Sequence, residues 1–420
     1  MFDRTVLPSG LRVISARLPG TRAFSAAAYV LVGSRQERRE KAGLAHFMEH
    51  ITFKGTHDLP DSRALSEAIE GVGGMSNAAT DRESTVYWTR LPVREAARAV
   101  HVLAELTLRP LLRTEDIAHE RDIIIEEIRS YRDDPGQFVF NIWDETFFGD
   151  TPMGREIAGD EATVKGLEDA DIREFWAAGY RPGNMVVSLA GDISHDEAVA
   201  MVAEGFDGAE RVAAEVEPAP TSPVGRFRVE ARDTAQAHVC LGIPGLARDD
   251  PDQWALELLN VVLGGGASSR LFLKVREEEG LAYDVHSFQI DYADTGTLQV
   301  YMGVDPLDVG AAMTAVLAEM SRLRDEPVGT DELERARNYT IGRMELRLEE
   351  SRAMASFIGT QEALHDRVMT TDEVIESLRA VTADQVMTLA GRLFSDDALC
   401  AAIIGQDLDG PALERNLRLP

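Results

Sequence analysis

Residues 42–53 read Ala42-Gly-Leu-Ala-His46-Phe-Met-Glu49-His50-Ile-Thr-Phe53, and two histidines stand four residues apart in this segment. On a helix, which we predict over residues 41–53, positions i and i+4 lie on one face. His46 and His50 can therefore direct ring nitrogens at one metal ion, and Glu49 lies beside them without having to be a ligand. Zn²⁺ takes imidazole and carboxylate ligands, and a catalytic zinc keeps one position for water. A nearby carboxylate can take the proton of that water.

A further ligand is expected from a second predicted helix, which begins at Thr114. On that helix Glu120, Ile124 and Glu127 are four and three residues apart, so they lie on one stripe. Two carboxylates on an otherwise apolar stripe are costly to bury unless a positive charge compensates them, and a divalent cation would do so. Glu126 is rotated about 100° away from Glu127. The stripe therefore selects Glu127 as the candidate ligand.

Length, charge and cysteine content limit which kinds of protein this chain can be. The chain has 420 residues, long for one core, so two or more domains are expected. A net charge of −29 argues against binding nucleic acid, which needs clustered Lys and Arg. The longest apolar run, residues 23–32, is too short to span a bilayer, and no signal peptide is recognised, so no membrane association is expected. Cys240 and Cys400 are too few for a disulfide framework, which favours the reducing cytoplasm.

Two similar halves are predicted on either side of a proline-rich linker, residues 217–225. We predict an α+β fold of two homologous domains, residues 1–216 and 226–420, each a mostly antiparallel sheet with helices packed on it. In the second half a helix over Trp254–Leu263, without metal ligands, stands where the first has its histidine helix. The matching strands are Leu11–Ala16, Phe24–Val32 and Met185–Gly191 in the first half, and Phe227–Ala231, Ala237–Ile243 and Leu399–Gly405 in the second.

These features resemble the M16 metallopeptidases, the family of pitrilysin, insulin-degrading enzyme and the mitochondrial processing peptidase, and in length its small bacterial two-domain members. The H-x-x-E-H order is the inverzincin pattern. Seventy-six residues separate His50 from Glu127, which is the family's spacing to the third ligand. The resemblance implies one Zn²⁺ per chain held by His46, His50 and Glu127, with Glu49 as catalytic base and Glu120 supporting the site. It also implies that one chain forms half of a clamshell.

A second segment resembles the family pattern N-A-aromatic-T-x-x-E-x-T-x-Y. It reads Asn77-Ala-Ala-Thr-Asp-Arg-Glu-Ser-Thr-Val-Tyr87. In the family this segment leads into an edge strand that pairs with the substrate backbone. The resemblance implies that Asn77 and Ala78 bind the peptide. Ala79 replaces the usual aromatic residue, which leaves the preference of the adjoining subsite open.

A third segment, Leu263-Gly-Gly-Gly-Ala-Ser-Ser-Arg through Tyr283, resembles the family's second signature. The resemblance implies that Arg276 and Tyr283 bind the substrate and that the Tyr283 hydroxyl helps to stabilise the oxyanion, a role suited to a neutral donor. In the family this pair faces a zinc from the opposite half of the clamshell. The implied assembly is therefore a homodimer in which Arg276 and Tyr283 are supplied in trans.

The expected function is that of a zinc-dependent endopeptidase hydrolysing peptides or unfolded segments in an enclosed chamber. Two alternatives stay open. One is a non-catalytic scaffold or core-type subunit of a larger assembly, because fold alone does not fix function. The other is a dedicated peptide-maturation subunit that needs a partner protein.

Overall fold

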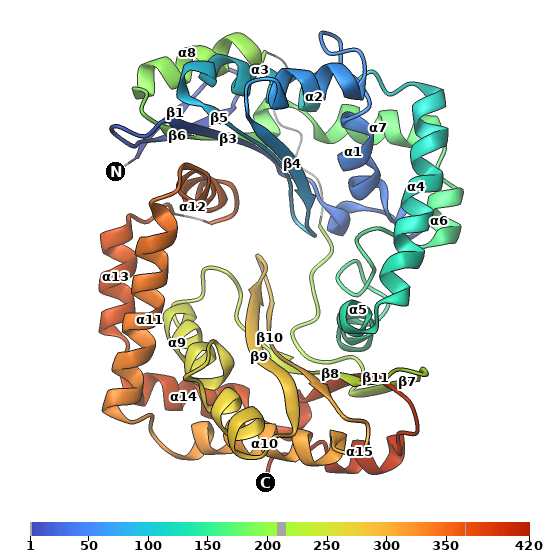
Figure 1. The fold of residues 1–420 in the computed structure, drawn as a ribbon, viewed down its shortest axis with the longest axis vertical. Coiled ribbons are helices and arrows are strands. Elements are labelled where there is room, and N and C mark those ends of the chain that lie inside the picture. Colours follow the sequence, from blue (N-terminus) through green and yellow to red (C-terminus); the bar gives the residue numbers. More distant parts are fainter. Residues whose placement is uncertain (1, 208–215, 366) are drawn as a thin grey trace. The chain divides into compact units, whose positions relative to one another are not determined.

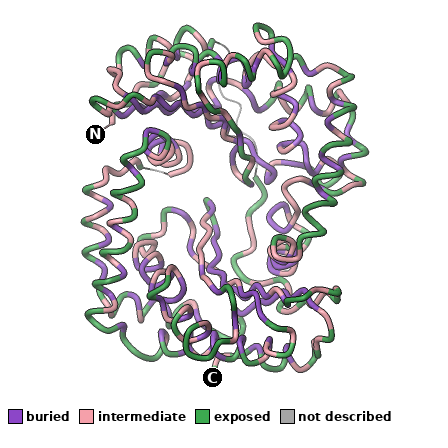
Figure 2. Tube along the Cα trace, viewed as in Figure 1, coloured by how far each residue is buried: buried purple, intermediate pink, exposed green. Residues whose placement is uncertain are grey.

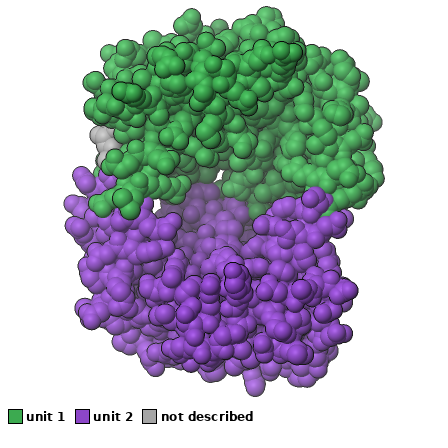
Figure 3. Space-filling model, in the orientation of Figure 1, with its two compact units in different colours: residues 1–129, 156–217, 345–370 green, residues 130–155, 218–344, 371–420 purple. Residues whose placement is uncertain are grey.

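The chain forms two compact units (Figure 3). The structure, a computed structural model, describes residues 2–207, 216–365 and 367–420. The units are not consecutive halves of the sequence, because each takes a segment from the far side of the predicted linker. The predicted domains, residues 1–216 and 226–420, are two homologous segments of the sequence, and this division stays a prediction. Unit 1 comprises residues 1–129, 156–217 and 345–370, and unit 2 comprises residues 130–155, 218–344 and 371–420.

Unit 1 is built on a six-stranded sheet with the order β1-β2-β6-β3-β5-β4. Strands β2 and β6 run parallel, and the other neighbouring pairs run antiparallel. The strand β4 lies at one edge of this sheet. The strands are β1 (Asp3–Val6), β2 (Arg12–Arg17), β3 (Ala23–Val30), β4 (Met75–Thr80), β5 (Thr85–Pro92) and β6 (Met185–Gly191).

Helices cover both faces of this sheet (Figure 1), α3 and α8 on one face and α12 on the other. The strand β3 is consequently buried on both faces (Figure 2), as its largely apolar sequence predicts. Phe24 joins the core on the α3 side, whereas the hydroxyls of Tyr29 and Thr360 of α12 are 3.2 Å apart. The helices are α1 (Leu44–Thr52), α2 (Ser62–Glu70), α3 (Ala96–Leu108), α4 (Thr114–Asp133), α6 (Glu161–Lys165), α7 (Asp169–Gly179), α8 (His195–Gly205) and α12 (Ser351–Leu364).

Unit 2 is built on a five-stranded sheet with the order β7-β11-β8-β10-β9, in which β7 and β11 run parallel. The helix α5 packs on β11 and β8, and Trp143 of α5 donates its indole N–H to the Cys400 carbonyl at 3.2 Å. The strands are β7 (Phe227–Ala231), β8 (Ala237–Pro244), β9 (Ala282–Asp291), β10 (Gly296–Val304) and β11 (Cys400–Gly405). The helices are α5 (Pro135–Phe148), α9 (Gln253–Gly264), the π-helix Phe272–Glu278, α10 (Val309–Asp325), α11 (Thr330–Leu348), α13 (Thr371–Ala380), α14 (Ala383–Leu393) and α15 (Gly410–Asn416).

The two sheets repeat one plan. The order β2-β6-β3-β5-β4 in unit 1 becomes β7-β11-β8-β10-β9 in unit 2, with the strands following the same chain order and with the parallel pair in the same place. The halves also exchange equivalent helices, because α5 packs on unit 2 and α12 packs on unit 1. The predicted α+β fold of two homologous, mostly antiparallel sheets is confirmed. Among the described residues, no helix combines the length and the apolar character needed to cross a membrane.

Candidate metal centre

The histidine helix α1 begins at Leu44, three residues later than predicted. Gly43 has φ +101°, a left-handed conformation, and a Cβ there would lie 2.7 Å from the Ala158 carbonyl oxygen. The backbone N–H groups of Gly43 and Ala45 donate to the buried carboxylate of Glu37 at 2.8 and 2.5 Å. Glu37 therefore satisfies donors that a helix N-terminus leaves without partners, and a negative charge there is favourable. This arrangement fixes the start of the helix.

Three candidate ligands converge in unit 1. His46 and His50 of α1 have ring centroids 4.6 Å apart, and Glu127 comes from α4. The carboxylate of Glu127 lies 3.9 Å from His46 Nε2 and 3.2 Å from His50 Nε2. One ligand atom of each residue lies within 4.8 Å of the others. Two imidazoles and one carboxylate are the donor set that suits a catalytic zinc, so these residues fit the ion that the sequence predicts.

Glu120 holds one of the two rings in place. Its side chain is only 2% exposed, and Oε2 lies 3.3 Å from His50 Nδ1. If Nδ1 carries the proton and donates it to Glu120, Nε2 keeps its lone pair on the side of Glu127. The ammonium of Lys54 lies 2.6 Å from the other oxygen of Glu120 and balances its charge. The family resemblance predicted that Glu120 supports the site. The contribution of Lys54, two residues after the end of α1, was not predicted.

The protonation of the two histidines differs sharply. Burial, followed by the charge of His50, lowers the pKa of His46 to about 4. Burial also lowers the pKa of His50, but hydrogen bonds with Glu120 and Glu127 outweigh it and raise that pKa to about 9. The hydrogen bond with His50 is also the main cause that lowers the pKa of Glu127. The two carboxylates thus stabilise positive charge at this position, as their place on one stripe of α4 predicts.

Glu49 lies beside the ligands, and the structure gives it a fixed orientation. Thr80, the last residue of β4, donates its hydroxyl to Glu49 Oε2 at 2.6 Å. Burial is the main cause that raises the pKa of Glu49, and the hydrogen bond from Thr80 only partly offsets it. A carboxyl with a raised pKa is a better proton acceptor at neutral pH. Thr80 belongs to the predicted motif, but its contact with Glu49 could not be predicted from the sequence.

The segment with Asn77 and Ala78 forms β4 itself, at the edge of the unit 1 sheet. Asn77 is exposed, and its side-chain oxygen accepts the Ala78 N–H at 2.9 Å. Ala78 is buried and Ala79 is exposed. Thr80 joins this edge strand to Glu49, so the strand and the candidate base belong to one local arrangement.

Arg276 and Tyr283 lie together in unit 2. The Arg276 guanidinium carbon is 5.3 Å from the centre of the Tyr283 ring and 4.9 Å from that of Phe272. The Tyr283 residue is 76% exposed. The pair is thus pre-arranged and accessible, as a substrate-binding role requires.

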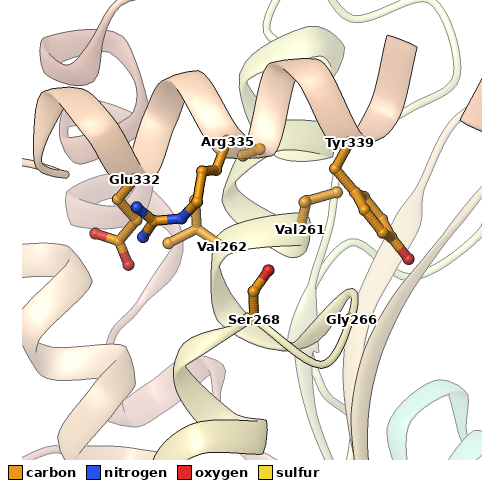
Figure 4. A pocket seen from close by; sticks show the side chains of 8 residues that line it. Val261, Val262, Gly266, Ser268, Glu332, Arg335 and Tyr339 are labelled. Carbon is orange, nitrogen blue, oxygen red and sulfur yellow. The ribbon is translucent and has the colours of Figure 1, made fainter. Parts of the chain in front are cut away.

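The glycines before this pair form a close-packed turn (Figure 4). A Cβ on Gly264 would lie 2.5 Å from the Ser287 backbone nitrogen, and one on Gly266 would lie 3.1 Å from the Tyr339 hydroxyl. Figure 4 shows Gly266 and Tyr339. The pocket beside the turn, lined by Val261, Ser268 and others, holds about 20 Å³, close to the space of one water molecule. The glycines therefore serve packing and leave no room there for a substrate.

The support given to His50 can be tested at Glu120. We expect Glu120→Ala to weaken zinc binding about 10–100-fold, because the His50 ring loses its acceptor. Glu120→Gln should lose less, since its amide oxygen can still accept from Nδ1 but has no charge. Competition with a chromophoric chelator measures both values, with thermal melting as a check on folding. Equal zinc affinity in wild type and Glu120→Ala would show that Glu120 does not support the site.

Comparisons with known proteins cover nearly the whole chain. Residues 12–161 match the family model described as Insulinase (Peptidase family M16), and residues 167–340 match Peptidase M16 inactive domain. An uncharacterized zinc protease of Streptomyces coelicolor is 37% identical over 398 residues, 92% of this chain and 86% of that protein. One of Bacillus subtilis is 31% identical over 407 residues, 96% of this chain and 98% of that protein.

Solved structures agree in fold. A protease from Helicobacter pylori superposes with a TM-score of 0.91 at 21% identity, covering 96% of this chain and 99% of that one. An M16-like peptidase from Alicyclobacillus acidocaldarius gives a TM-score of 0.86 at 19% identity, covering 96% and 98%. At such identities these structures support the fold alone. Because the family models and the relatives above 30% identity both span most of the sequence, this chain belongs to the M16 peptidase family and is of its small bacterial type.

Proposed function

We propose that the protein is a zinc-dependent endopeptidase that cleaves peptides or unfolded segments. The observation that carries this proposal is the convergence of His46, His50 and Glu127, with Glu49 fixed beside them by Thr80. A scaffold role would not need a complete ligand set together with an oriented carboxylate. The relatives carry the name uncharacterized zinc protease, and this name supports the same activity.

His46, His50 and Glu127 would hold the ion, and Glu120 would keep His50 in the right tautomer. Zn²⁺ bound there would polarise the scissile carbonyl and acidify a water molecule. Glu49 accepts the proton of the attacking water and later delivers it to the leaving amine. Its raised pKa suits both steps, because the group must take up and release a proton near neutral pH.

The peptide would bind along β4. An edge strand offers backbone N–H and C=O groups that can pair with an extended peptide independently of its sequence. Asn77 and Ala78 would lie against the residues next to the scissile bond, and the exposed Ala79 would line an adjoining subsite. Binding through the main chain accounts for a peptidase that accepts many sequences in an enclosed chamber.

Removal of metal tests the activity itself. A quenched-fluorescent peptide should be cleaved by the purified chain, cleavage should stop after treatment with 1,10-phenanthroline, and stoichiometric Zn²⁺ should restore it. Cleavage should depend on the ion because a metal-bound water is far more acidic than free water, and the three ligands alone cannot cause this change. A chain that takes up zinc and still cleaves none of a diverse peptide library would contradict the proposal and favour the scaffold role.

Arg276 and Tyr283 extend the proposal to a homodimer, in which the pair of one chain serves the zinc of its partner. Tyr283→Phe should lower kcat about 10²–10³-fold, the usual loss for one oxyanion donor. Inactive Glu49→Gln and Tyr283→Phe chains, refolded together, should regain activity, because a mixed dimer contains one intact site. Lack of recovery in a mixture shown to contain heterodimers would contradict supply in trans.

A further inference from the structure

A second group of metal-ligating side chains lies in unit 1, away from the first group. Asp58 is in the loop after α1, and His101 and Glu105 stand four residues apart on α3. One ligand atom of each lies within 4.8 Å of the others. The group opens into a groove of about 730 Å³ that is also lined by residues of α2 and α8. We propose that it is a second binding site for a divalent transition-metal ion of the zinc class.

The spacing of the donor atoms supports this assignment. His101 Nε2 lies 3.5 Å from Asp58 Oδ2. Two donors bound to one tetrahedral zinc at about 2.0–2.1 Å are about 3.4 Å apart. The i, i+4 spacing of His101 and Glu105 places both on one face of α3, as it does for His46 and His50 on α1. The site needs only small movements to close on an ion.

Neighbouring groups hold the carboxylates of Asp58 and Glu105 in place. His57 Nδ1 lies 2.9 Å from Asp58 Oδ1, which leaves Oδ2 on the side of His101. Glu105 is 1% exposed, and it accepts the Asp58 backbone N–H at 2.8 Å and Arg109 at 3.2 Å. Such second contacts orient metal ligands and are typical of built sites. Glu105 is thus a buried anchor, while Asp58 and His101, about half exposed, admit the ion from solvent.

The charges suggest which ion and how tightly it binds. Asp58 and Glu105 contribute two negative charges, and Arg109 offsets one of them. One imidazole with two carboxylates prefers Zn²⁺, Co²⁺ or Ni²⁺ to the all-oxygen coordination of Ca²⁺ or Mg²⁺. Because of Arg109, we expect weaker binding here than at His46, His50 and Glu127. A bound ion would fasten the loop after the histidine helix to α3.

Zinc binding by full-length variants tests this inference separately from the peptidase activity. The His46→Ala/Glu127→Gln variant lacks the first ligand set. We expect it to bind one equivalent of Zn²⁺ in equilibrium dialysis with elemental analysis. Adding His101→Ala, or Asp58→Asn as a milder change on the exposed loop, should remove that equivalent. Adding His119→Ala, an exposed histidine of α4 outside both groups, should leave it unchanged.

Hydrogen exchange provides the second readout. In the His46→Ala/Glu127→Gln variant, Zn²⁺ should slow the exchange of backbone amides in residues 54–60, and it should fail to do so once His101→Ala is added. The inference is overturned if that double variant binds no zinc, if His101→Ala and Asp58→Asn both keep the equivalent, or if exchange in 54–60 does not respond to zinc.

Discussion

Glu49→Gln should bind one zinc at the first ligand set as tightly as wild type, while its kcat falls about 10²–10⁴-fold, the usual contribution of a general base. The amide is nearly the same size as the carboxylate, and its oxygen can still accept the hydroxyl of Thr80. It cannot accept a proton from water. The loss should therefore appear in kcat with little change in KM, measured with a quenched-fluorescent peptide beside elemental analysis of the same sample.

The matched control makes the same substitution at an exposed glutamate. Glu126 of α4 is 72% exposed in its side chain, and its carboxylate pairs with Arg129. Glu126→Gln should retain full activity. If Glu49→Gln cleaves the peptide as fast as Glu126→Gln, another group must be the base, and the proposed role of Glu49 is wrong.

The second large effect is expected at Glu127. Glu127→Gln replaces a charged ligand by a neutral amide, so zinc affinity should fall by more than the about 10–100-fold that the loss of an outer-shell partner causes. Activity should be lost at zinc concentrations that saturate wild type. Competition with a chromophoric chelator gives the affinity, read on a background of His101→Ala so that only the first ligand set is counted.

Here Glu126 serves as the neighbouring control on the same helix, one residue away and about 100° around it. Glu126→Gln should bind zinc like its parent. If the two variants lose zinc equally, the effect comes from the charge of the helix as a whole. The ligand assignment would then fail, because it depends on Glu127 alone facing the histidines.

Helical periodicity predicted which candidate residues share a helix face, whereas their roles as ligands stay predictions. Local helix geometry places His46 and His50 on one face of α1, and Glu120 and Glu127 on one stripe of α4. That these two faces meet in unit 1 depends on the packing of α1 against α4, which periodicity does not predict. The start of α1 was misplaced by three residues, since the left-handed Gly43 and the Glu37 cap depend on contacts distant in sequence. Boundaries of this kind are decided by tertiary packing.

Other features could not be read from the sequence. The hydrogen bond from Thr80 to Glu49 and the ion pair of Lys54 with Glu120 depend on how α1 meets β4 and α4. The segment exchange was also missed, because an amphipathic helix shows which face it buries but not which sheet covers that face. The sequence repeat predicted two sheets with one plan, and it gave no sign that α5, from the first half of the sequence, packs on the sheet of unit 2 or that α12, from the second half, packs on the sheet of unit 1.

That exchange affects the order of events during synthesis on the ribosome. The sheet of unit 1 needs α12 on one face, where Ser188 donates to the Ala355 carbonyl and Gly359 allows close approach to Tyr29. Residues 351–364 are translated about 160 residues after Gly191 (351 − 191 = 160), which ends the last strand of that sheet. Until then the nascent N-terminal sheet has an uncovered apolar surface, so we expect unit 1 to complete its folding only after α12 has been translated.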